Sequence, residues 1–247
     1  MNGRTTSSCL ALACLALAGS ADAGPAPDKL APSATGVTTL RCGTLIDGRS
    51  ASVKRDVEIR IEDGRIVSVG EFTPGAAGPM NGAVIDRSQD TCLPGLIDAH
   101  AHVLIKTDDY QVDHLRRSSG YKALRGLNVV QEMLRSGWTT VRILGDADVA
   151  YAHLDVRTAI QEGLFIGPRL TGAGHYFSIT GGGGDLNFLG PEHQVVADGL
   201  VVDGVDAVRK AVREEIKHGS DWIKVLASGA MMSAGNDPNR APFSPEE

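Results

Sequence analysis

This sequence has few aromatic residues, no long apolar run and no excess of positive charge. Phe, Trp and Tyr make up 4% of the 247 residues, so aliphatic side chains and alanine must fill the core. Lysine and arginine total 24 against 30 acidic residues, and the net charge of −6 argues against nucleic acid or an anionic membrane as a partner. The apolar run at residues 9–18 is too short to span a bilayer, so no membrane span is expected.

The first 23 residues have the pattern of a secretory signal peptide. Arg4 precedes the apolar run, and Ala21-Asp22-Ala23 is a small-x-small cleavage site that leads into a Pro/Ala/Ser linker at residues 24–36. An ordinary N-terminal helix or a membrane anchor, with Cys14 as a minority lipidation site, is the alternative interpretation. The signal peptide predicts a secreted or periplasmic protein.

Cysteine is also rare, with four in the chain, and cleavage after Ala23 would leave only Cys42 and Cys92. These two flank a small β-rich region, and an oxidising compartment would permit them to pair. The sequence cannot supply the geometry that a disulfide requires, so the bonded and the free states both stay open.

Residues 37–92 are expected to form a small β-module. Asp47-Gly48 and Asp63-Gly64 mark turns, and the second is typical of a β-hairpin. Short segments rich in β-branched residues predict strands at residues 37–45, 57–61, 65–69 and 83–86.

From residue 93 onward the pattern alternates between strands and helices. Strands are expected at residues 93–103, 139–144, 169–173 and 221–227, and helices at residues 121–135, 152–161 and 205–218. The apolar spacing predicts two buried helix faces, formed by Leu124, Leu127, Val130 and Leu134 and by Val205, Val208, Val212 and Ile216. Alternating βα units predict an α/β fold with a parallel sheet, either a barrel or an open sheet.

The βα region is short for a complete barrel. Eight βα units need about 250 residues, and residues 93–247 provide room for about four to five. The final Ser244-Pro245-Glu246-Glu247 is typical of a helix N-terminus, with a capping serine followed by proline and acids. We therefore expect a truncated sequence, and a half barrel with exposed strand edges is expected to aggregate or to form an oligomer.

A candidate metal site lies at the end of the first predicted strand of this region. Side chains alternate along a strand, so Asp98, His100 and His102 are expected to share one face. Two imidazoles at the carboxyl end of a parallel strand can bind one divalent metal from one side. An ordinary pair of surface or core histidines is the alternative, and these residues alone do not decide between the two.

Several ordered motifs resemble the amidohydrolase superfamily. Residues 93–103, Leu-Pro-Gly-Leu-Ile-Asp-Ala-His-Ala-His-Val, are similar to its first-strand signature, and the β-module resembles its N-terminal half-sandwich. Residues 137–142, 167–169, 178–185 and 221–225 are similar to the imidazolonepropionase-like branch, which includes Xaa-Pro and Xaa-Arg/Lys dipeptidases. The resemblance covers nearly all of residues 37–247. It implies a TIM-type (β/α)8 barrel, here the N-terminal part of one, preceded by a small β-sandwich module.

The resemblance also implies the site. His100 and His102 would ligate the more buried of two zinc ions, and Lys224, carboxylated by CO2, would bridge the pair. A lysine that extends along apolar surface or pairs with Asp221 is the alternative for Lys224. The rim of the pocket would carry His175, Tyr176 and Gly183. The resemblance further implies two more histidine ligands and a general-base aspartate, which are expected beyond residue 247.

The implied reaction is hydrolysis of a C–N amide bond by metal-activated hydroxide, with a dipeptide or an N-acyl amino acid as the small-molecule substrate. A cyclic amide of the hydantoin or imidazolone type is the second hypothesis. The third is a catalytically incomplete fragment that lacks the later ligands. The sequence departs from the family pattern at two positions, Gly183 and Ile143, where many relatives have histidine and aspartate respectively. Both differences bear on substrate choice.

Overall fold

The structure is a computed structural model that describes residues 36–73, 82–106, 108–233, 237 and 239–247. The predicted signal peptide and residues 24–35 of the linker lie outside the described residues. The elements, in chain order, are β1 (Val37–Leu45), β2 (Lys54–Glu62), β3 (Arg65–Glu71), β4 (Ala83–Cys92), β5 (Leu96–Ala101), α1 (Tyr110–Arg116), α2 (Ser119–Arg135), β6 (Trp138–Leu144), α3 (Ala152–Gln161), β7 (Arg169–Ala173), β8 (Tyr176–Ser178), β9 (Leu200–Val201), α4 (Val205–Lys217) and β10 (Lys224–Val225).

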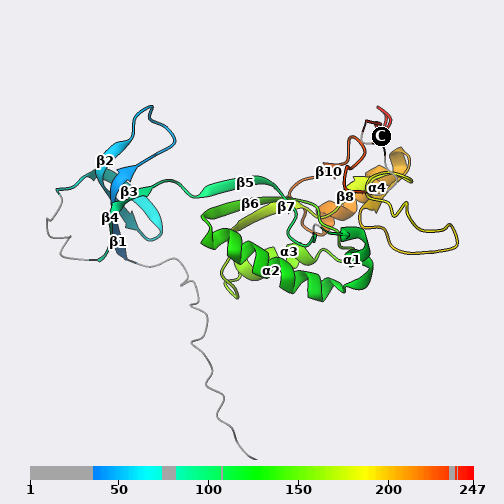
Figure 1. Ribbon diagram of the computed structural model, residues 1–247, viewed down its shortest axis with the longest axis horizontal. Helices are drawn as coiled ribbons and strands as arrows, with labels where there is room; N and C mark the ends of the chain where they lie inside the picture. The colour runs from blue at the N-terminus through cyan, green and yellow to red at the C-terminus, as the bar shows by residue number, and fades with distance from the viewer. Residues whose placement is uncertain (1–35, 74–81, 107, 234–236, 238) are drawn as a thin grey trace, which may run out of the picture.

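Strands β1 to β4 form one sheet in the order β3-β2-β1-β4, which lies apart from the remaining elements in Figure 1. The predicted hairpin is confirmed: Asp63 and Gly64 both have positive φ, and Glu62 pairs with Arg65. Strand β4 is longer than predicted, because it pairs with β1 as far as Cys92. Within the described residues this module is a single sheet, and the second layer of the expected sandwich is not among them.

The core of the β-module is small and contains a disulfide. Its buried members are Cys42, Leu45, Val57 and Ile59. Cys42 and Cys92 are joined across β1 and β4, with their Cα atoms 5.9 Å apart. Of the two states that the sequence left open, the structure therefore shows the bonded one. Because four buried side chains supply little hydrophobic stabilisation, a covalent link is an important part of the module's stability.

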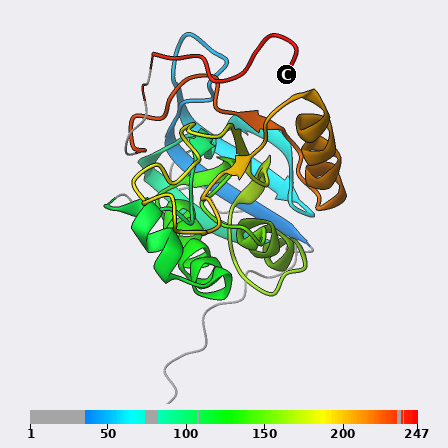
Figure 2. The same cartoon turned by 90° about the vertical axis from the view of Figure 1, so that its right-hand side faces the viewer.

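The remaining strands form the expected parallel array. Strand β5 pairs with β6 and β6 with β7, while β8 pairs with β10 and β9. The two sheets are joined where the Asp221 amide donates to the Gly172 carbonyl at 2.8 Å. The predicted α/β fold is confirmed, with helices α2 and α3 against one face of β5, β6 and β7 (Figure 1). Figure 2 shows α2 (green) and α4 (orange) on different sides of the strands. The described strands form an open array.

The prediction of the buried helix faces was partly wrong. On α2, Val130 is buried as expected, but Leu124 is 69% exposed and Gly126 lies inside. A side chain at Gly126 would collide with Leu104, so the helix lies close to the segment that follows β5 there. On α4, Ile216 is 63% exposed whereas Glu215 is fully buried. Spacing alone favoured the isoleucine, but the hydrogen bonds that the Glu215 carboxylate accepts turn the glutamate inward.

Some elements differ from the expected ranges. Helix α1 and the short strands β8 and β9 had no clear signal, and β10 covers only two residues of the segment predicted at 221–227. The predicted helix start at the C-terminus is a turn. In it the Glu247 carboxylate accepts from the Ser244 amide at 2.9 Å, a contact typical of a capped helix.

One face of the βα array is open to solvent in the described residues. Ile97 on β5 is 68% exposed, and Trp222 and Val225 beside or on β10 are also exposed. This agrees with the expected exposure of apolar surface, while aggregation and a homo-oligomer stay predictions. None of the described helices is both long and apolar enough to cross a membrane.

Candidate functional site

His100 and His102 come together at the carboxyl end of β5. Their ring centroids lie 5.4 Å apart with an interplanar angle of 65°. The Asp98 carboxylate accepts the His100 amide at 3.0 Å, and the pairing of β5 with β6 shifts register between Asp98 and Ala101. The strand is therefore locally irregular at the histidines, and the aspartate side chain is used to shape the backbone.

The His102 ring is oriented by the next strand. Its Nδ1 lies 2.6 Å from the Gly145 carbonyl oxygen just after β6. A carbonyl can only accept, so Nδ1 carries the proton and Nε2 keeps a lone pair. Burial lowers the pKa of His102; the bond to Gly145 opposes this, while His100 and the Lys224 charge lower it further. A neutral ring protonated on Nδ1 leaves Nε2 free to ligate a metal ion.

Gly145 has to be a glycine for this bond to form. Its φ is +80°, and a Cβ there would lie 2.5 Å from the Tyr176 amide nitrogen. The next residue, Asp146, is fully buried, and its Oδ2 accepts the Val103 amide at 3.0 Å. Burial raises the pKa of Asp146 to about 8 against the opposing effect of its backbone hydrogen bonds.

Lys224 approaches the same region from β10. It pairs with Tyr176 in the parallel β8–β10 ladder, and its charge contributes to the lowered pKa of His102. The alternative pairing of Lys224 with Asp221 is not found, because Asp221 binds Arg157 at 2.7 Å and also accepts Thr171 and the Gly172 amide. The Lys224 ammonium has no hydrogen-bond or ion-pair partner among the described residues.

The three expected pocket residues lie in different surroundings. The Tyr176 ring is 6.2 Å from the His102 ring, centroid to centroid, so it lies beside the histidine pair. His175 faces the other way: its Nδ1 donates to Glu215 at 2.7 Å and the side chain is buried against Tyr151. This placement does not support a substrate contact for His175. Gly183 lies against Ala230, and a Cβ there would be 2.7 Å from the Ala230 Cβ.

A buried polar network behind Tyr176 had no signal in the sequence. The Tyr176 hydroxyl donates to Asp198, and the Gln111 amide donates to the other oxygen of that carboxylate at 2.7 Å. Tyr110 contacts Ser233 at 2.8 Å, and the Ser233 hydroxyl donates to the Gly183 carbonyl. These bonds join α1 to loops separated from it by dozens of residues, which only the tertiary structure could reveal. Burial raises the pKa of Asp198.

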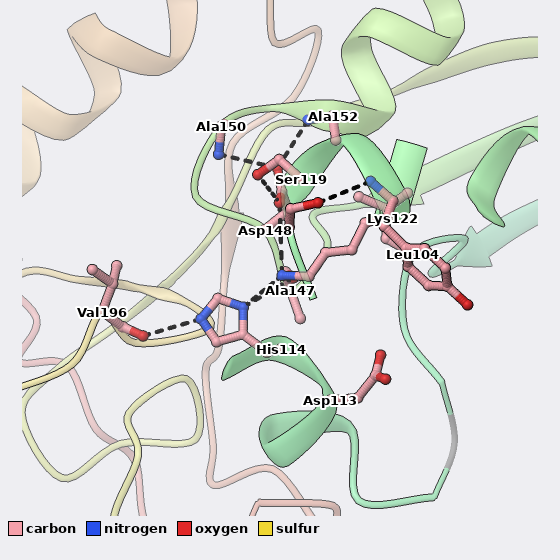
Figure 3. Close-up of polar contacts among 12 residues, drawn as sticks. Leu104, Asp113, His114, Ser119, Lys122, Ala147, Asp148, Ala150, Ala152 and Val196 are labelled. Atoms are coloured by element: carbon pink, nitrogen blue, oxygen red, sulfur yellow. Dashed lines mark hydrogen bonds and ion pairs between the residues drawn. The ribbon is translucent and has the colours of Figure 1, made fainter. Parts of the chain in front are cut away.

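A second buried cluster supports the turn after β6 (Figure 3). The Lys122 ammonium donates to the His114 Nδ1 at 2.9 Å and to the Ala147 carbonyl at 2.8 Å. His114 donates through Nε2 to Val196, and Asp148 accepts Ser119 and the amides of Ala150 and Ala152. Burial lowers the pKa of Lys122 against the attraction of Asp148. The cluster anchors the part of the turn from Ala147 to Ala152.

The donors present fit a divalent metal only in part. The free Nε2 of His102, the adjacent His100 ring and the unpartnered Lys224 converge from two strands. No group of three or more His, Cys, Asp and Glu in the described part of the chain can hold a metal ion. A site here therefore needs Lys224 or ligands from outside the described residues, as the resemblance implied.

Comparison with known proteins supports this reading of the fold. Ochratoxinase from Aspergillus niger is 32% identical over 229 residues, covering 85% of this chain and 46% of the relative. A solved Xaa-Pro dipeptidase with methionine bound in its active site has a TM-score of 0.75 at 29% identity and covers 85% of this chain and 52% of the other. A prolidase complexed with N-methylphosphonate-L-proline has a TM-score of 0.72 at 31% identity, covering 84% and 50%.

This chain thus spans about half the length of the relatives that it matches. The matched half contains the β-module and the parallel βα array with its histidine pair. Residues 91–247 match the amidohydrolase family in sequence. This chain therefore belongs to the amidohydrolase family.

Proposed function

We propose that this protein hydrolyses a C–N amide bond of a small peptide-like molecule, such as a dipeptide or an N-acyl amino acid. The family and its hydrolase relatives support the class of reaction, and a prolidase and an Xaa-Pro dipeptidase among the similar structures favour a dipeptide. The chain spans about half the length of these relatives. The proposal therefore concerns the whole protein, to whose site the residues of this chain contribute the first ligands.

One observation carries the proposal. The His102 ring is fixed with its proton on Nδ1, so its free Nε2 lies beside the His100 ring and within reach of the charge of Lys224. In a purely structural histidine pair, both ring nitrogens of each histidine could form hydrogen bonds with neighbouring groups, and no Nε2 lone pair would need to stay free. Neutral imidazoles with one outward lone pair are the form used in metal sites.

We propose that His100, His102 and Lys224 hold the metal, with zinc as the ion, and that the whole protein binds two. Members of this family are generally metal-dependent. When bound, such an ion polarises the amide carbonyl and lowers the pKa of water. The chain's own residues hold the ligands in place: Gly145 keeps the His102 proton on Nδ1, and the β8–β10 ladder sets Lys224 opposite Tyr176. A carboxylated Lys224 would present oxygen ligands instead of an ammonium.

Zinc binding tests the metal site directly. We expect His102→Ala and His100→Ala each to weaken zinc affinity more than about 100-fold, because loss of a ligand should exceed the 10–100-fold effect of an outer-shell change. Competition with a chromogenic chelator measures the affinity. For Lys224, ¹³C NMR after exchange with labelled bicarbonate should show a carbamate signal that Lys224→Ala lacks.

His193→Ala is the matched control, because the His193 side chain is exposed and its ring pairs with Glu192 at 3.7 Å. It should bind zinc as the parent protein does. Equal zinc affinity in His102→Ala and His193→Ala would overturn the proposed metal site.

The substrate is tested by comparing the turnover of Xaa-Pro dipeptides and N-acyl amino acids with that of a hydantoin. Preferential hydrolysis of the cyclic amide would overturn the peptide-like assignment.

We also propose that the protein works outside the cytoplasm. The Cys42–Cys92 disulfide supports an oxidising compartment, which agrees with the predicted signal peptide at residues 1–23. Cell fractionation should find the protein in the periplasm or the medium. Deletion of residues 2–23 should move it to the cytoplasm, and an unchanged distribution would contradict the proposal.

A further inference from the structure

Asp146 has an unusual position for a carboxylate. Its side chain is completely buried at the carboxyl end of β6, and its Oδ1 accepts no hydrogen bond from any described residue. A buried polar atom without a partner costs on the order of 1–3 kcal/mol, so such an atom usually has a purpose. The Nδ1 atom of His102 lies 3.9 Å from this Oδ1.

The other oxygen of Asp146 holds the chain immediately after His102. Oδ2 accepts the Val103 amide at 3.0 Å, and the nearby amides of Leu104 and Ile105 oppose the rise in the pKa of this carboxyl group. The segment directly after His102 is thus anchored to a side chain just beyond the end of β6. This fixes the direction in which the backbone leaves β5 and, with it, the position of the His102 Cα–Cβ bond.

The carboxylate also affects the ring. Its Oδ1 lies 3.9 Å from the Nδ1 of His102, beyond hydrogen-bond distance, so it leaves the Nδ1 proton to the Gly145 carbonyl. Gly145 accepts that proton at 2.6 Å, and Asp146 follows Gly145 directly in the chain. Asp146 therefore favours the Nδ1-protonated tautomer by anchoring both the segment that follows His102 and the turn that carries the Gly145 carbonyl.

We propose that Asp146 is a positioning residue for His102, which holds the β5 exit and keeps the ring proton on Nδ1 so that Nε2 is presented to the site. This inference rests on the proposed metal site for its functional meaning. The orientation of the ring, however, is a property of the chain without any metal, so it can be measured separately.

The experiment is ¹⁵N NMR of histidine-labelled protein without metal, with His102→Gln to assign the signal. We expect His102 in the parent protein to be protonated on Nδ1. In Asp146→Asn an amide NH2 or carbonyl replaces the carboxylate, and we expect the Nδ1-protonated population to fall and zinc affinity to weaken about 10–100-fold. The other histidines should keep their tautomers.

Asp148→Asn is the matched control, because Asp148 is equally buried on the same turn but contacts Ser119 and Lys122 instead of His102. It should lower stability without changing the His102 tautomer or the zinc affinity. An unchanged tautomer and zinc affinity in Asp146→Asn would overturn the proposal. His102 protonated on Nε2 in the parent protein would also overturn it, and this readout does not depend on whether Asp146→Asn folds.

The two proposals fail in different ways. A protein that binds no zinc but whose His102 tautomer depends on Asp146 would refute the metal site and keep the positioning role. A protein that binds zinc equally well with either residue at position 146 would refute the positioning role and keep the site.

Discussion

Replacing Glu215 by glutamine is expected to lower the free energy of unfolding by about 3 kcal/mol, because a buried carboxylate with several donors would lose its charge. Glu215 accepts the His175 amide at 3.0 Å, the His175 ring at 2.7 Å, the Ser220 hydroxyl at 2.7 Å and the Tyr151 hydroxyl at 2.9 Å. In glutamine, one of the two oxygens becomes an NH2 group, which faces donors and cannot accept from them.

The pH dependence should identify the carboxylate as the cause. Burial would raise the pKa of Glu215, but the bonds from His175 and Ser220 outweigh it and lower the pKa from 4.5 to about 2. A lowered pKa means that the stabilisation is complete above pH 4.5 and is lost as the pH falls toward 2, which amounts to roughly 3 kcal/mol. The difference between the parent and Glu215→Gln should therefore be largest at neutral pH and shrink in acid.

Urea denaturation at pH 7 and at pH 3.5, followed by circular dichroism, measures both effects. Glu214→Gln is the matched control, because Glu214 is the exposed neighbour on the same helix and has the same helix propensity. It should change stability by less than about 0.5 kcal/mol. A Glu215→Gln protein as stable as Glu214→Gln at pH 7 would show that the four contacts do not stabilise the fold.

Removing the Cys42–Cys92 disulfide is expected to destabilise the β-module by about 4 kcal/mol. The bond links residues 50 positions apart, and the loop-entropy relation gives about 4 kcal/mol for a loop of that size. With four buried hydrophobic side chains in the described part of its core, the module has little other stabilisation to offset the loss. We expect Cys42→Ser/Cys92→Ser to unfold the β1–β4 sheet at a lower temperature than the βα region.

Hydrogen exchange measured by mass spectrometry separates the two regions. Peptides from β1, β2 and β4 should exchange faster in the double variant, while those from β6 and α2 should not change. Adding a reductant to the parent protein should reproduce the effect and should do nothing further to the variant. Unchanged protection of β1 and β4 in the double variant would contradict the expectation.

The sequence was sufficient where the signal was local. Asp63-Gly64 specified its hairpin because both residues tolerate positive φ, and the βα alternation specified the parallel array. The sequence did not predict which of two adjacent residues on a helix points toward the core. Ile216 looked like the buried residue of α4, but Glu215 is buried instead. Its partners are Tyr151 just before α3, His175 between β7 and β8, and Ser220 before β10.

For the candidate site, the sequence determined its ligand types and only the tertiary structure decided their surroundings. The His100–His102 spacing and the motifs around Lys224 indicated a metal site on two different strands. The tautomer of His102 depends on Gly145 and Asp146, and the separation of Tyr176 from His175 depends on Asp198 and Glu215. The hydrogen bonds that these partners make join residues 22 to 43 positions apart in the chain. A local pattern cannot encode such contacts, because they exist only once the strands and helices have packed together.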